Sequence, residues 1–76
     1  MVQITEFEIK WREEFTRRLK ARAEEIGFTR KDLSEQSGIS YTEICFMYRG
    51  MRIPHATTIV KLAQALAVNP GYLIEF

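Results

Sequence analysis

The chain has 76 residues, enough for one small domain, and a hydrophobic fraction of 46% supplies material for a compact core. Its net charge of +1 excludes a uniformly basic surface, so nucleic-acid binding would require the basic groups to be gathered on one face. The single cysteine, Cys45, excludes an internal disulfide and indicates a reducing, cytoplasmic location. No apolar run is long enough for a membrane span, and the first ten residues, with two glutamates and no early basic region, are not typical of a signal peptide.

A helix-start signal occurs three times along the chain. The hydroxyl residue is followed three positions later by an acid in the pairs Thr5/Glu8, Thr29/Asp32 and Ser40/Glu43. In such a capping box the hydroxyl accepts from an amide of the first turn, and the carboxylate accepts from the amide of the capping residue. Because each pair opens an apolar pattern with helical spacing, we expect helices to begin at residues 6, 30 and 41.

The first helix is predicted from about Glu6 to Ile26, ended by Gly27. Residues 2–11 also alternate as a strand would, but the cap favours a helix. We expect the apolar stripe to face the core; it consists of Phe7, Trp11, Phe15, Leu19, Ala23 and Ile26. The basic residues Arg17, Arg18, Lys20 and Arg22 are balanced by glutamates and predict a solvated face with salt bridges; the alternative is a phosphate contact by Arg17 or Arg18.

The second and third helices are predicted at 30–37 and 41–49, separated only by a short turn containing Gly38 and Ile39. So short a connection makes the helices cross at a wide angle, as in a helix-turn-helix. Helical spacing divides the third helix into two faces. The inner face carries Ile44, Met47 and Tyr48, and the outer face carries Tyr41, Thr42, Cys45, Phe46 and Arg49.

Two further helices complete the prediction. Pro54 lies in a loop, a fourth helix follows from Ala56 to Ala67, and Asn69-Pro70 opens a short fifth helix. The fold class is therefore all-α, a compact five-helix bundle. His55 has no second metal-type residue at useful spacing and is expected at the cap of the fourth helix. No nucleophile-base pair, phosphate-cradling glycine loop or metal cluster is apparent, so we expect no enzyme, cofactor or metal.

Residues 15–74 resemble the Cro and phage-repressor (Xre-like) helix-turn-helix family. The matching pieces are FTRRLKARAEEIGFTRKDLSEQSGIS, Ile44, RGMRIP, TIVKLAQALAV and YLI. The resemblance implies a lambda-repressor-like fold in one domain of residues 1–76, with 1–14 as an N-terminal extension of the first helix. It also implies a homodimer that binds a palindromic operator in double-stranded DNA and often represses transcription.

The resemblance assigns DNA contacts to particular positions. Tyr41, Thr42 and Phe46 match the positions that contact base edges, and Arg30, Ser40 and the loop after Gly50 match phosphate contacts. The chemistry of the residues agrees in part. Arg30 lies at a helix N-terminus, which favours anions, and Arg49 and Arg52 flank the end of the third helix. Thr42 can hydrogen-bond a base edge or contact a thymine methyl group.

The chain departs from the family pattern in two places. A common ion pair between the first and third helices is replaced by Ala23 and Tyr48, which we interpret as a change of packing. Tyr41, Cys45 and Phe46 occupy positions where polar residues that contact bases are usual. Recognition of a DNA sequence would therefore rely on apolar contacts and on DNA shape. The alternative is a protein-binding module, such as an antitoxin or adaptor, that uses these aromatic residues.

Two features remain open at this point. Cys45 is either a packing residue or a redox-sensing thiol, for which Arg49 is the obvious positive neighbour. Aromatic and apolar residues at the chain's ends either cover the core or form a two-fold interface. The dimer candidates are Tyr72, Ile74 and Phe76, aided by the first helix.

Overall fold

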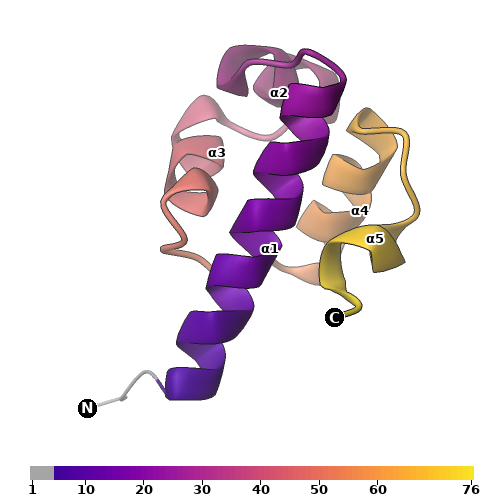
Figure 1. Ribbon diagram of the computed structural model, residues 1–76. Helices are drawn as coiled ribbons and strands as arrows, with labels where there is room; N and C mark the ends of the chain where they lie inside the picture. The colour runs from indigo at the N-terminus through magenta and orange to yellow at the C-terminus, as the bar shows by residue number, and fades with distance from the viewer. Residues whose placement is uncertain (1–4) are drawn as a thin grey trace.

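The computed structural model describes residues 5–76, and this part of the chain contains five helices and no strand (Figure 1). They are α1 (Glu6–Glu25), α2 (Arg30–Ser37), α3 (Tyr41–Tyr48), α4 (Ala56–Ala65) and α5 (Pro70–Ile74). The all-α five-helix prediction is confirmed. Within residues 5–76, no helix combines the length and apolarity that a bilayer crossing needs.

All three predicted helix starts are present, but only the one at Thr29 forms both hydrogen bonds of a capping box. The amide of Glu8 donates to the Thr5 hydroxyl at 3.1 Å, and residues 6–11 are helical. Residues 2–4 of the alternating segment lie outside the described residues. At Thr29 the capping box is complete, and donation from the Thr29 amide helps hold the pKa of the Asp32 carboxyl below its usual value. The Ser40 hydroxyl accepts from Glu43, whose carboxylate instead lies near Arg52.

Helix α4 ends two residues earlier than predicted. Its last helical residue is Ala65, and Ala67 adopts a left-handed conformation with φ of 56°. This turn lets the amide of Val68 donate to the carbonyl of Ala63 at 3.0 Å, which satisfies a carbonyl of the last helical turn. His55 lies at the N-cap of α4 as predicted, without a capping bond from its side chain.

The core lies between α1 and the other helices. Figure 1 shows α1 running through the molecule with α3 on one side and α4 and α5 on the other. The largest fully buried side chains come from all five helices: Phe15, Leu19, Leu33, Ile44, Met47, Leu62, Leu66 and Leu73. A common core of this kind fixes the orientation of α3 relative to α1 and α2.

The predicted apolar stripe of α1 is correct from Phe15 onward and wrong at Phe7. The Phe7 side chain is 76% exposed because the first turns of α1 project beyond the other helices (Figure 1). Trp11 is intermediate: its ring stacks on Phe15 at 5.5 Å and contacts the Phe76 ring at 5.6 Å. The N-terminal end of the stripe is therefore an exposed apolar surface.

The basic face of α1 is only partly the solvated face that was expected. Arg17 forms an exposed ion pair with Glu14, as predicted. Arg18, however, donates to the carbonyls of Tyr72 and Glu75 at 2.9 Å each, and Arg22 donates to the carbonyl of Leu66 at 3.0 Å. These two arginines therefore hold the C-terminal segment against α1, a role that helical spacing alone does not reveal.

Candidate nucleic-acid interface

Helix α3 exposes one face and buries the other. Ile44 and Met47 are fully buried and Ile39 is buried in the turn that follows α2, which fixes the crossing of the two helices. On the outer face, Tyr41 is 48% exposed and Thr42 is also exposed. Arg49 is exposed as well, but Cys45 and Phe46 are only half-buried. The predicted outer face is therefore exposed mainly at Tyr41, Thr42 and Arg49.

Tyr48, expected on the inner face, is only half-buried. The Lys20 ammonium lies 5.7 Å from the centre of its ring, and burial raises the pKa of the Tyr48 hydroxyl. Ala23, which together with Tyr48 replaces the ion pair common in the family, is buried in the core. Tyr48 thus lies at the border between the core and the α1–α3 surface.

Two arginines from outside α3 cover aromatic rings on its outer face. The Arg30 guanidinium, at the start of α2, lies 6.0 Å from the centre of the Tyr41 ring. The Arg52 guanidinium, in the loop after α3, lies 4.8 Å from the Phe46 ring. Such contacts are favourable because the ring face is electron-rich. Sequence reasoning missed this pairing because it depends on how the neighbouring segments cross α3.

Positive charge is distributed around the outer face of α3. Arg52 lies 4.0 Å from the Glu43 carboxylate, whereas Arg49 is exposed and has no ion pair within residues 5–76. The Ser40 hydroxyl accepts the capping bond from Glu43, so its own proton remains available for donation. The predicted phosphate-binding residues Arg30, Ser40, Arg49 and Arg52 therefore lie at the start of α2 and at both ends of α3.

Cys45 lies next to a different arginine from the one expected. Its sulfur is 3.9 Å from Nη1 of Arg30, so Arg30 is a positive neighbour that helical spacing within α3 did not suggest. The reason is again the crossing of α2 and α3, which brings the start of α2 to the middle of α3. The thiol itself is half-buried.

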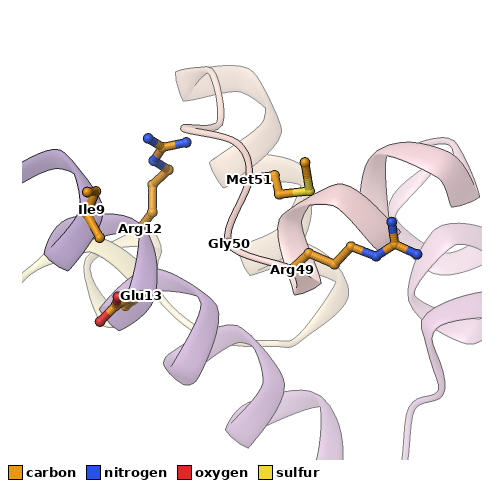
Figure 2. Close-up of a pocket in the computed structure, with 6 residues that line it drawn as sticks. All are labelled: Ile9, Arg12, Glu13, Arg49, Gly50 and Met51. Carbon is orange, nitrogen blue, oxygen red and sulfur yellow. The ribbon is translucent and has the colours of Figure 1, made fainter. Parts of the chain in front are cut away.

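A surface pocket of about 410 Å³ lies beside the end of α3 (Figure 2). One wall comes from α1 and includes Ile9, Arg12 and Glu13; the other comes from Arg49, Gly50 and Met51. Sequence reasoning placed no function at Arg12, since a single basic residue in a long charged helix carries no distinguishing pattern.

The predicted dimer residues differ in accessibility. Tyr72 and Phe76 are 40% and 51% exposed, whereas Ile74 is partly buried against the core. Phe76 also lines a second pocket, of about 400 Å³, with Phe7 and Trp11. Exposed aromatic side chains thus lie near the C-terminus and, at Phe7, on the first turns of α1.

Comparison with known proteins gives two matches. The model of the helix-turn-helix family HTH_3 matches residues 19–73, which begin in the C-terminal half of α1 and end in α5. The crystal structure of the restriction-modification controller protein C.AhdI from Aeromonas hydrophila is similar, with a TM-score of 0.76 and 30% sequence identity; the match covers 79% of this chain and 91% of that one. Among curated proteins, none shows significant sequence similarity to this chain.

Proposed function

This chain belongs to the helix-turn-helix family, and on that premise we propose that it is a sequence-specific, DNA-binding transcriptional regulator. The observation that supports this function most strongly is the outer face of α3, where exposed Tyr41 and Thr42 lie among arginines from three segments. The similar protein C.AhdI is named as a controller, which supports a regulatory role for this chain as well.

In the proposed complex α3 lies in the major groove. Arg30, Ser40, Arg49 and Arg52 contact backbone phosphates, which fixes the position of the protein without choosing a sequence. The side chains that face the bases are Tyr41, Thr42 and Phe46. Thr42 offers a hydroxyl and a methyl group, and the two rings offer apolar contact to thymine methyl groups. Sequence-dependent DNA shape supplies the remaining discrimination.

We further propose that the protein acts as a small dimeric repressor on a palindromic operator, with half-sites about 34 Å apart. Its proposed location is the cytoplasm, in association with the nucleoid. The exposed rings of Tyr72 and Phe76 support a two-fold contact, with Phe7 as an additional member. Ile74 contributes less, because part of its side chain already packs on the core.

The test is to select binding sequences from a random pool of duplexes and to measure affinity for the selected duplex as salt is raised. The affinity should fall steeply, with a slope of about −0.9 for each phosphate neutralised. Arg49→Ala should weaken binding to selected and unrelated duplexes alike, because it removes a phosphate contact. Absence of binding to any duplex at low salt would contradict the proposal, and a protein partner that protects Phe46 would then favour a protein-binding module.

A further inference from the structure

Arg12 differs from the other arginines of α1 in having no identified partner. Its Nε atom is buried and has no hydrogen-bond acceptor, and its guanidinium forms no ion pair within residues 5–76. The other arginines of the helix are bound to the protein itself: Arg17 to Glu14, Arg18 to Glu14 and the C-terminal carbonyls, Arg22 to Leu66 and Glu25. A buried donor without an acceptor is unfavourable, so Arg12 loses no bond if it turns toward a ligand.

The side chain of Arg12 extends into the pocket beside α3. Figure 2 shows it reaching from α1 toward the loop that carries Gly50 and Met51, while the Glu13 carboxylate points to the other side. In the same figure, the Arg49 side chain starts from the opposite wall and points away from Arg12. Because Arg49 is exposed and unpaired among the described residues, its long side chain is free to turn toward the same ligand.

A hydrogen bond ties together the two helices that lead into the walls of the pocket. The buried hydroxyl of Thr16 donates to the carbonyl of Met47 at 2.8 Å, which ties α1 to the last turn of α3. Gly50 follows with φ of 69°, a conformation that favours glycine and turns the chain away along the pocket. A pocket with fixed walls loses little conformational entropy when it binds a ligand.

The residues that line the pocket are chemically suited to one deoxyribose-phosphate unit of a DNA backbone. Ile9 and Met51 present exposed apolar side chains that match the carbon face of a deoxyribose, and Arg12 and Arg49 match the charge of a phosphate. The pocket is also continuous with the loop after Gly50, where phosphate contacts are expected. We propose that Arg12 binds a DNA backbone phosphate, supplemented by Arg49, so that α1 extends the interface beyond the family-matched residues 19–73.

This inference rests on the proposed DNA-binding function, and its test separates the two. Arg12→Gln should weaken binding about tenfold at fixed salt, for selected and unrelated duplexes alike, and reduce the salt slope by about one per protomer. Lys10→Gln is the control: it removes the same charge from the same helix, but Lys10 lines the pocket beside Phe76. Its salt slope should match that of the wild type. Glu13→Gln should strengthen binding, because it removes a negative charge from the pocket rim.

Replacing single phosphates by neutral methylphosphonates identifies the contact. At one position per half-site, the neutral linkage should weaken wild-type binding, and Arg12→Gln should cause no further loss there. Arg12→Lys, which keeps the charge, should retain most of the salt slope and covers the case in which Arg12→Gln fails to fold. If the wild type binds DNA and Arg12→Gln has the same slope, the inference is wrong and the function stands. If the wild type binds no duplex, both are wrong.

Discussion

Individual side chains on α3 combine apolar and cationic character in a way that neither composition nor net charge reveals. The Phe46 ring lies under Arg52 and the Tyr41 ring lies near Arg30. A base edge that approaches this face therefore meets rings whose positions are stabilised by neighbouring cations. Thr42 lies in the first turn of α3 and is exposed, so its hydroxyl can form a directional hydrogen bond. We expect it to carry the most specific base contact.

Replacement of Thr42 by alanine should change sequence preference more than overall affinity. Loss of one base contact is expected to cost about 1–3 kcal/mol at a single base position and little on unrelated duplexes. Competition among all single-base variants of the selected duplex measures the effect. A uniform loss across every variant would show that Thr42 does not read a base.

Thr16 provides a separate prediction for stability. Thr16→Val keeps the shape of the side chain but removes one of the two donors to the carbonyl of Met47, which still accepts from the Gly50 amide at 3.0 Å. The expected cost is that of one hydrogen bond, about 0.5–1.5 kcal/mol. Urea unfolding measures the loss, with Thr57→Val, at an exposed position on α4, as the control. Equal stabilities for the two variants would mean that the Thr16 hydrogen bond contributes nothing.

Helix starts and the core were predictable because both depend on local patterns. Thr29 with Asp32 specifies a capping box within four residues, and the buried positions of α1, α3 and α4 follow helical spacing. The errors have a shared cause. Each error depends on how separate helices are placed relative to one another. Phe7 is exposed because α1 projects beyond the other helices, Arg18 binds carbonyls near the C-terminus, and Arg30 of α2 lies next to Cys45 of α3. Arg12 was missed because a single basic residue in a long charged helix has no distinguishing pattern.

The contact between α1 and α5 should depend on pH through Glu14. Hydrogen bonds from Arg17 and Arg18 lower the pKa of Glu14 from 4.5 to about 2. A carboxyl with a depressed pKa contributes stability above its ordinary value and loses it as pH falls toward the lowered one. Thermal unfolding should therefore show a constant gap between wild type and Glu14→Gln above pH 4.5, narrowing as pH approaches 2. A gap independent of pH would contradict this assignment.

In the proposed dimer two reading helices bind one operator, and the exposed rings near the C-terminus and at Phe7 offer a contact for the second protomer. Phe7 is mostly exposed, so Phe7→Ser should change the stability of the isolated chain by less than about 0.5 kcal/mol while weakening self-association. Light scattering across a concentration series measures the association. Ile53→Ser, at another exposed apolar residue, is the control and should leave association unchanged. Equal association in both variants and the wild type would place the dimer contact elsewhere.

Cys45 can serve as a chemical probe of the proposed DNA-contacting face, because it is the single cysteine of the chain and lies in the middle of α3. The rate at which iodoacetamide alkylates this thiol can be measured with and without saturating amounts of the selected duplex. If α3 occupies the major groove, the duplex should slow alkylation strongly, and an unrelated duplex at high salt should not. An unchanged rate at saturation would show that DNA binds to some other face of the protein.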